Sequence, residues 1–518
     1  MRAGVKDVQE SGSEIGYTVG DNMPESVRFV VRPDVDLKRW EYVSVDNRNS
    51  KVIARVERIV SRSDLLKEGI DYNSVEKFVN ADINESVTVA IAKTTGTIKD
   101  DEVFKSGREI IRPGTVVRIA ETRLLKKLFG FPEEDSIYIG NLADHEDIPI
   151  GVSLSGLRRH LAILSQTGAG KSNTAAVLIE EILKKGGTIV VLDPHADYVL
   201  MKRSSSGKIF SENTKVFRTP MSTGRYSAEM SAITEMFTLR FQDLDEDDLF
   251  DIMRINEKWT TLRDIVREAL QKTGGKRDLK DFLESVDRLT PDKRGKISGR
   301  IALLRSIKDI FSQRTTDISE YLGPGQLSVL DLSGLDQDVT AYFTLRVLEE
   351  IYDKKVSGEF KLPVFVFIEE AHNFVGLESF GKLPVLIKKI AGEGRKFGVF
   401  LVVITQRPGK IDQDVLSQCN SQIILRITNP IDQRAIAESC EFVSQAIIDD
   451  LPSLNTGEAV ITGQIVRFPT VVKIRRRETM EGGGDIDLLS LLREAREMRN
   501  KLKDPKFEKD RISKLMEG

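Results

Sequence analysis

The spacing of apolar and polar positions changes along the chain. Between residues 27 and 150, short segments rich in β-branched residues alternate apolar with polar positions, as in "KVIARVERIV" (51–60), and Pro, Asp, Asn or Gly separate them. A period of two is typical of strands that bury one face. We therefore predict an antiparallel β-barrel over residues 23–150, with one helical stretch near 121–129. The polar, glycine-containing residues 1–22 are predicted to form a flexible arm.

Beyond residue 150, nearly continuous apolar segments alternate with segments of helical period. Strands that are apolar on both sides and alternate with helices are typical of a parallel sheet with both faces covered. We therefore predict an α/β core in two parts, residues 151–239 and 321–475. Its predicted strands include "HLAIL" (160–164), "TIVVLD" (188–193), "LSVLDL" (327–332), "PVFVFI" (363–368), "VFLVVIT" (399–405) and "SQIILRI" (421–427).

Two stretches of helical period lie outside this core. Residues 240–320 are highly charged and contain segments such as "WTTLRDIVREALQKTGG" with almost no strand signal, so we predict a helical insertion there. Residues 476–518 are predicted to form a linker with a flexible joint at "GGGD" (482–485), an amphipathic C-terminal helix and a charged tail.

Composition limits the partners and the compartment. Of the 518 residues, 30% are charged, but 77 Lys and Arg nearly balance 80 Asp and Glu, for a net charge of -3. No global basic field indicates nucleic acid, so any DNA-binding groups must be concentrated locally. Two cysteines cannot build a disulfide framework or a zinc site, no signal-like segment opens the chain, and its apolar runs are too short for a bilayer. We expect a cytoplasmic protein without membrane contact.

The segment "LSQTGAGKSN" (164–173) lies between a predicted buried strand and a predicted helix, the context of a phosphate-binding loop. Glycines allow the tight backbone that directs N–H groups at phosphates, and the following helix adds its dipole. Lys171 is expected to reach the β- and γ-phosphates of ATP, and Ser172 to ligate Mg²⁺. The common pattern has glycine where this chain has Ser165, which we expect to be tolerated unless the backbone requires a positive φ. The predicted nucleotide-binding residues here are Gln166, Thr167, Gly168, Ala169, Gly170, Lys171, Ser172 and Asn173.

Polar residues end three further predicted strands. Glu369 and Glu370 follow "PVFVFI", on a strand expected to neighbour the loop strand; we assign Glu369 to the magnesium side and Glu370 to the general base. Gln406 ends the next strand and is expected to sense the γ-phosphate or position the attacking water. Asp193 ends the strand after the loop helix, so we expect it to point into the same crevice and contact the nucleotide.

In combination these segments resemble the HerA family of hexameric ATPases, within the HerA–FtsK division of RecA-like P-loop motors. The resemblance covers roughly residues 151–475 and rests on "RRHLAILSQTGAGKSNT", "VVLDPHADY", "LSVLDLSGLD", "FVFIEEAHNFV", "EGRKFGVFLVVITQRP" and "LRITNPIDQRAI", in the family's order. The N-terminal barrel, helical insertion and C-terminal helix also fit its layout. Ser165 departs from the family pattern, as does a Glu-Glu pair where Asp-Glu is common, and we expect activity to survive both.

The resemblance implies a homohexameric ring around duplex DNA in a central channel, with ATP and Mg²⁺ bound between subunits. It implies an arginine supplied in trans by the neighbouring subunit, for which Arg395 in "GEGRKFG" is our first candidate and Arg426 and Arg434 are weaker ones. It further implies a NurA-like nuclease partner docked on the barrel face. The expected function is ATP-driven double-stranded DNA translocation or unwinding in DNA end resection for recombinational repair.

Two other functions stay open from the sequence. One is a DNA-pumping motor of packaging or conjugation type, although many such motors carry membrane helices. The other is a ring scaffold whose ATP binding only regulates a partner enzyme, which would have no need of a catalytic base. The DNA-contacting segments also stay open: residues 201–208, 381–389 and 473–477 are basic, but each also fits an ordinary solvated face.

Overall fold

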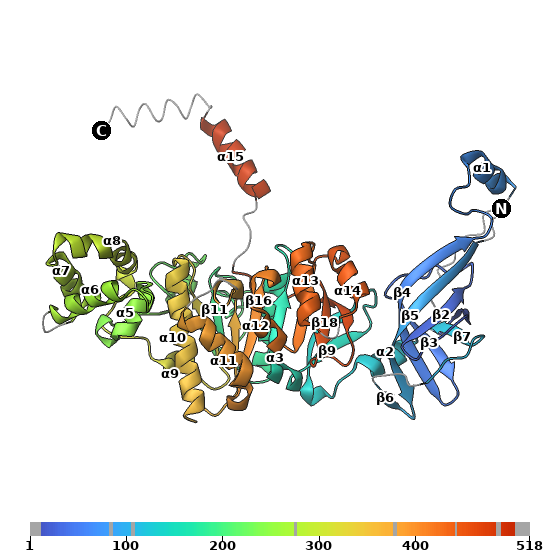
Figure 1. Cartoon of the computed structure of the whole chain (residues 1–518), viewed down its shortest axis with the longest axis horizontal. Coiled ribbons are helices and arrows are strands. Elements are labelled where there is room, and N and C mark those ends of the chain that lie inside the picture. The colour runs from blue at the N-terminus through green and yellow to red at the C-terminus, as the bar shows by residue number, and fades with distance from the viewer. Residues whose placement is uncertain are drawn as a thin grey trace.

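The computed structural model describes residues 12–81, 86–104, 109–273, 277–376, 381–440, 443–482 and 488–502. A β-barrel lies at one end, an α/β unit in the middle and a helical insertion at the other end (Figure 1). Of the predicted terminal segments, residues 1–11 of the arm, most of the "GGGD" joint and the tail from residue 503 lie outside the described part.

Six antiparallel strands close the N-terminal barrel in the order β2-β1-β7-β3-β4-β5, and β5 pairs back to β2. A seventh strand, β6, extends from β5. Alternate strand residues such as Val27, Phe29, Val43 and Val45 fill its interior and are fully buried. The elements are β1 (Glu14–Thr18), β2 (Ser26–Val31), β3 (Tyr42–Asn47), β4 (Ser50–Ser63), α1 (Tyr72–Asn80), β5 (Ser86–Lys99), β6 (Glu102–Phe104) and β7 (Val116–Ile119).

Both predicted ends of the barrel are corrected by the structure. Strand β1 lies inside the predicted flexible arm and pairs with β2 and β7. One glycine of this segment, Gly16, lies in β1, where an added Cβ would lie 1.9 Å from the carbonyl oxygen of Val30, so close strand pairing requires it. At the other end, β8 (Ser136–Leu142) and β9 (Pro149–Ser153) belong to the central sheet, because β8 pairs with β19 rather than with a barrel strand. The predicted helix near 121–129 is α2 (Thr122–Phe129).

The central sheet has twelve strands. Eight run parallel, in the order β13 (Glu235–Met236), β12 (Thr214–Arg218), β14 (Leu327–Asp331), β11 (Thr188–Asp193), β15 (Val364–Ile368), β16 (Val399–Thr405), β10 (Leu161–Leu164) and β17 (Ser421–Leu425). Four antiparallel strands extend it, in the order β18 (Glu458–Gly463), β19 (Thr470–Ile474), β8 and β9. The predicted parallel sheet is therefore mixed at one edge.

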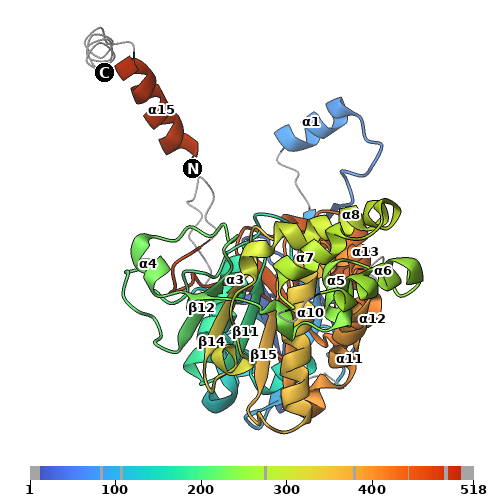
Figure 2. The ribbon, with the colours of Figure 1, turned by 90° about the vertical axis from the view of Figure 1, so that its left-hand side faces the viewer.

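Helices cover both faces of this sheet, as the doubly apolar strands predict. Successive residues of β10 belong to different cores: Leu161 and Ile163 pack with α3, and Ala162 and Leu164 pack with the side that includes α10 and α11. Figure 2 shows α10 and α11 on one side of β11, β14 and β15. The helices are α3 (Lys171–Lys184), α4 (Ala228–Ala232), α10 (Gln337–Val356), α11 (Lys382–Phe397), α12 (Gln413–Gln418), α13 (Pro430–Ser439) and α14 (Gln445–Asp450).

The helical insertion contains α5 (Glu246–Ile252), α6 (Thr260–Gln271), α7 (Leu279–Asp287), α8 (Pro291–Ser306) and α9 (Ile318–Tyr321). A capping box at Asp245 starts α5, and Pro291 occupies the first turn of α8, both common ways to begin a helix. Helix α15 (Leu488–Leu502) projects from the body in Figures 1 and 2, with Leu488 and Leu489 exposed. None of the helices in the described ranges is long and apolar enough to cross a membrane.

Candidate nucleotide-binding site

The phosphate loop connects β10 to α3, as predicted. Gly168 has φ +75° and Gly170, the N-cap of α3, has φ +106°, a backbone conformation that favours glycine. Ser165 is buried, its φ is not positive, and its N–H donates to the Thr405 carbonyl over 3.2 Å. The departure from the common glycine therefore introduces no backbone strain, which confirms the condition on which we expected Ser165 to be tolerated.

Lys171 and the two predicted glutamates form a buried ionic cluster. The Lys171 Nζ lies 2.8 Å from the Glu369 Oε2 and 2.5 Å from the Glu370 Oε1. The exposed fractions are 7%, 1% and 4% for Lys171, Glu369 and Glu370. Contrary to expectation, the glutamate strand does not adjoin the loop strand: β16 lies between β15 and β10, so the three side chains meet across one intervening strand.

Burial and charge act in opposite directions within this cluster. Burial lowers the pKa of Lys171, but the charges and hydrogen bonds of Glu369 and Glu370 outweigh it and raise this pKa above its ordinary value. Burial raises the pKa of Glu369 despite Lys171. Burial opposes ionisation of Glu370 too, but Lys171 and Gln406 outweigh it and lower the pKa of Glu370. The lowered pKa favours the ionised form of Glu370, the form in which a carboxylate can accept a proton.

Gln406 links the phosphate loop to Glu370. Its Nε2 donates to the Glu370 Oε1 over 2.6 Å, and its Oε1 accepts a hydrogen bond from the Thr167 hydroxyl. Glu370 has φ +48° and ψ +44°, a left-handed conformation that is strained for a residue other than glycine. Strain of this kind persists where the surroundings fix the residue, and here hydrogen bonds from Lys171 and Gln406 hold the Glu370 side chain.

The loop after β11 behaves differently from the prediction. Asp193 is fully buried, and its carboxylate accepts hydrogen bonds from the N–H groups of His195, Asp197 and Tyr198 at 3.2, 3.1 and 2.9 Å. Burial raises the pKa of Asp193. Its oxygens therefore hold the loop together, and the buried carboxylate does not point into an open crevice as predicted. The side chains that reach the site are Asp197, which accepts from the Ser172 hydroxyl over 2.6 Å, and Tyr198, whose hydroxyl donates to Glu369.

Three other predicted loop residues tie the phosphate loop to neighbouring segments. The Gln166 Oε1 accepts from the Thr428 N–H and hydroxyl at 3.1 and 2.9 Å. The Ala169 carbonyl accepts from the Gly457 N–H at 3.0 Å. Asn173 donates to the Arg475 carbonyl over 2.8 Å and accepts from the Arg477 N–H over 2.9 Å.

Arg395 lies at the opposite edge of the sheet from the phosphate loop. It occupies the last turn of α11, is exposed, and its charge acts on His160, which precedes β10, whereas the phosphate loop follows β10. Arg395 thus cannot reach the ATP site of its own chain. Arg426 is half-buried beside the phosphate loop, where its carbonyl accepts from the Gln166 N–H over 3.0 Å, and Arg434 is exposed on α13.

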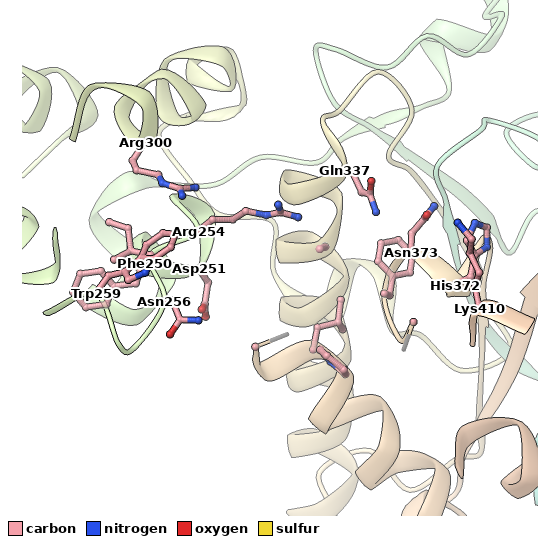
Figure 3. Close-up of a pocket in the computed structure, with 17 residues that line it drawn as sticks. Phe250, Asp251, Arg254, Asn256, Trp259, Arg300, Gln337, His372, Asn373 and Lys410 are labelled. Atoms are coloured by element: carbon pink, nitrogen blue, oxygen red, sulfur yellow. The ribbon is translucent and has the colours of Figure 1, made fainter. Parts of the chain in front are cut away.

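A cleft of about 1040 Å³ separates the helical insertion from the core. In Figure 3, Arg254, Trp259 and Arg300 lie on the insertion side, and Gln337, Asn373, His372 and Lys410 lie on the core side. None of the predicted site residues lines this cleft. It adjoins the site through His372, whose Nδ1 lies 3.3 Å from the Glu370 Oε2 and 3.1 Å from the Thr405 Oγ1.

Asp197 and Tyr198 were not predicted as site residues, although both lie in the segment "LDPHADY" at the end of a strand that reaches the site. For the basic residues 473–477, a nucleic-acid role stayed open from the sequence. In the structure, Arg475 pairs with Glu180, Glu181 and Glu478, so at least this cation is neutralised within the chain.

A phosphate loop between a parallel strand and a helix, with carboxylates and a glutamine at the ends of two adjoining strands, defines a P-loop NTPase with a RecA-like core. The family model for the helicase HerA central domain matches residues 137–351, and the model for the HAS barrel domain matches residues 15–118. The chain belongs to the HerA helicase family.

Relatives align over nearly the whole chain. The DNA double-strand break repair helicase HerA of Pyrococcus furiosus is 29% identical over 90% of this chain and 93% of its own length. The protein of the same name from Sulfurisphaera tokodaii is 29% identical over 93% of this chain and 97% of its own length. A protein of Methanocaldococcus jannaschii named probable helicase MJ1565 is 28% identical over 92% of this chain and 93% of its own length.

Two solved structures align with this chain at low sequence identity. The conjugative coupling protein TrwB aligns over 69% of this chain and 92% of its own chain, with a TM-score of 0.48 and 14% identity. VirB4 of Thermoanaerobacter pseudethanolicus aligns over 67% of this chain and 98% of its own chain, with a TM-score of 0.47 and 16% identity.

Proposed function

We propose that this chain is an ATP-driven, hexameric double-stranded DNA translocase or helicase that acts with a nuclease in DNA end resection. The observation that carries the proposal is the cluster of Lys171, Glu370 and Gln406, in which a cation, a carboxylate and an amide contact one another beside the phosphate loop. The names of the relatives, DNA double-strand break repair helicases, support the choice of DNA and of repair.

ATP fits the phosphate loop by its chemistry. The backbone N–H groups at the start of α3 and the ammonium of Lys171 suit the triphosphate, and Lys171 must then exchange part of its contact with the two glutamates for phosphate oxygens. The Ser172 hydroxyl is the protein ligand that we assign to Mg²⁺. When bound, the metal ion would neutralise developing charge on the phosphate oxygens.

Glu370 is the proposed catalytic base. Its lowered pKa keeps it ionised near neutral pH, so that it can take a proton from the attacking water. Gln406, bonded to both Glu370 and Thr167, is proposed to report γ-phosphate contact at the loop to the base, and to position the water.

The position of Arg395 supports the proposed ring. An exposed arginine at the far edge of the sheet can complete only the site of a neighbouring copy, and such an arginine contributes about a thousand-fold or more to hydrolysis in other P-loop enzymes. We propose a homohexamer by family analogy, with duplex DNA in its channel. The barrel lies at the end of the molecule remote from the insertion and offers the proposed docking face for a NurA-like nuclease (Figure 1).

The test is steady-state ATP hydrolysis by the complete chain, with and without linear duplex DNA, for the native protein and Glu370→Gln. We expect DNA to stimulate the native protein, and the variant to bind ATP but lose activity by about 10²- to 10⁴-fold, the usual contribution of a general base. Equal hydrolysis by both proteins would remove Glu370 from the mechanism.

The scaffold alternative makes the opposite prediction for the native chain. A ring that only regulates a partner would bind ATP without turnover, with or without DNA, and would stay inactive when the nuclease is added. The proposed catalytic base argues against the scaffold. Burial disfavours the charge of Glu370, yet its contacts with Lys171 and Gln406 favour the ionised form, which a scaffold does not need. A packaging or conjugation motor would instead hydrolyse ATP on DNA without a co-purifying nuclease.

A further inference from the structure

The Ser172 hydroxyl is held by a carboxylate from outside the predicted acidic pair. A hydroxyl has one proton to donate and two lone pairs. Here Ser172 donates its proton to the Asp197 Oδ2 over 2.6 Å, which orients the lone pairs of the same oxygen away from Asp197. A ligand oxygen whose proton is held by a carboxylate is a better donor to a cation.

Glu369, in contrast, has both carboxylate oxygens engaged. Its Oε2 contacts the Lys171 ammonium at 2.8 Å, and its Oε1 accepts from the hydroxyl of Tyr198, which is fully buried. Releasing Glu369 toward a metal ion would leave the Tyr198 hydroxyl without its partner inside the protein, which is costly. The buried tyrosine therefore keeps Glu369 beside Lys171.

Asp197 is presented by a rigid loop. The Asp193 carboxylate holds its N–H at 3.1 Å, and its carbonyl accepts from the N–H of Gly482 at 3.2 Å. Ala196, just before it, has φ +60°, a strained conformation that the surrounding hydrogen bonds maintain. Within the part of the chain that the structure describes, no Lys, Arg or His forms an ion pair with the Asp197 carboxylate. Arg477 lies nearby: its Nη1 donates to the Asp197 carbonyl over 3.4 Å, and the charges of Arg477 and Asp197 attract each other.

From these contacts we propose that Asp197 is the positioning residue of the magnesium site: it orients Ser172 toward Mg²⁺, while Tyr198 fixes Glu369 as the partner of Lys171. This assignment adds a carboxylate from the loop after β11 to the acidic pair after β15. It deepens the proposed function and rests on it, because it concerns the same nucleotide site.

The test measures how much Mg²⁺ strengthens the binding of a fluorescent, non-hydrolysable ATP analogue to the complete chain. Asp197→Asn is expected to lose about ten-fold or more of this gain, the usual effect of removing a partner of a metal ligand, with unchanged affinity in EDTA. Asp197→Glu, which retains a carboxylate, is expected to recover part of the gain. Glu212→Gln, an exposed site that loses the same charge, is the matched control and is expected to match the native protein.

A double-mutant cycle separates positioning from a general loss of structure. If Asp197 acts through Ser172, adding Asp197→Asn to Ser172→Ala changes the magnesium gain little further, whereas independent effects would add. The proposal is overturned if Glu369→Gln reduces the magnesium gain and Asp197→Asn does not. It is also overturned if Asp197→Asn lowers affinity equally with Mg²⁺ and EDTA.

This readout distinguishes the inference from the proposed function. Binding of the analogue does not require hydrolysis, so a native chain that binds with a magnesium gain but never turns over ATP would overturn only the motor. A native chain that binds no nucleotide would overturn both.

Discussion

His160 is a buried side chain whose surroundings determine its protonation state. It is 2% exposed, and its Nδ1 accepts a hydrogen bond from the Leu401 N–H over 2.9 Å, which requires an unprotonated nitrogen. Burial and the nearby charge of Arg395 lower the pKa of His160 to about 4. The fold therefore stabilises the neutral imidazole that connects the start of β10 to β16.

This predicts a loss of stability in mild acid. Because the folded pKa lies below the ordinary 6.5, the stabilisation is complete above pH 6.5 and declines as pH falls from 6.5 toward 4. Between about pH 7.5 and pH 5, the free energy of unfolding of the native protein should fall by about 2 kcal/mol more than that of His160→Gln. The glutamine retains a hydrogen-bond acceptor but does not titrate. Thermal unfolding of both proteins at the two pH values measures this. Parallel losses would show that other groups govern the acid sensitivity.

The phosphate loop shows which residue types can be inferred from sequence alone. Gly168 and Gly170 adopt positive φ, so the motif's glycines follow from backbone sterics. Lys171 and Glu370 are 199 positions apart in the sequence. They meet because the carboxyl ends of parallel strands share one edge of the sheet. Asp193 ends such a strand too, yet it turns back onto its own loop, because three nearby N–H groups compete for its carboxylate.

Helix α3 is secured by a segment from the far end of the chain. Residues 475–482, which we name the C-terminal strap, run beside α3 and the loop after β11. The fully buried Glu180 accepts at 2.8 Å from the N–H groups of Glu478 and Thr479 and from the Thr479 hydroxyl. The N–H of Gly482 in the strap also donates to the Asp197 carbonyl, so the strap supports the loop after β11 as well as α3.

Removing this anchor should loosen the strap. Glu180→Ala leaves several buried donors without an acceptor, and we expect it to destabilise the protein by about 2–4 kcal/mol. The matched control is Glu181→Ala, which also removes a partner of Arg475 but accepts from neither strap amide, and should destabilise the protein less than Glu180→Ala does. Chemical denaturation of both variants compares them, and proteolysis within 475–482 locates the effect. Equal losses would assign the stability to Arg475 rather than to the amides.

In the whole molecule, the two parts that we propose for one catalytic site lie at opposite edges of the sheet. The phosphate loop lies at the carboxyl ends of the parallel strands, and Arg395 lies at the other edge, exposed. Assembly in which one edge meets the other brings the halves together, and a rotation that closes makes a ring.

Mixing inactive variants tests this arrangement. Lys171→Ala and Arg395→Ala should each be inactive alone, and subunits assembled together should regain part of the hydrolysis, because some interfaces then pair an intact loop with an intact arginine. ATPase assays after dissociation and co-assembly measure the recovery, and mixing Lys171→Ala with Glu370→Gln, both on the same side of the interface, is the control. Recovery in the control as well, or none with Arg395→Ala, would remove the trans role from Arg395.

The amino-acid pattern was sufficient for the β-barrel, the α/β core, the helical insertion and the phosphate loop, because hydrophobic period and backbone sterics act locally along the chain. Pairing between distant segments needed the tertiary structure. It places β1 inside the barrel and β8 in the central sheet, inserts β16 between β15 and β10, and brings Asp197 rather than Asp193 to Ser172. The alternation of apolar and polar residues predicts which face of a sheet a residue occupies, but it does not predict which strand lies next to it. The partner of a carboxylate depends on every hydrogen-bond donor around it, and only the tertiary structure brings these donors together.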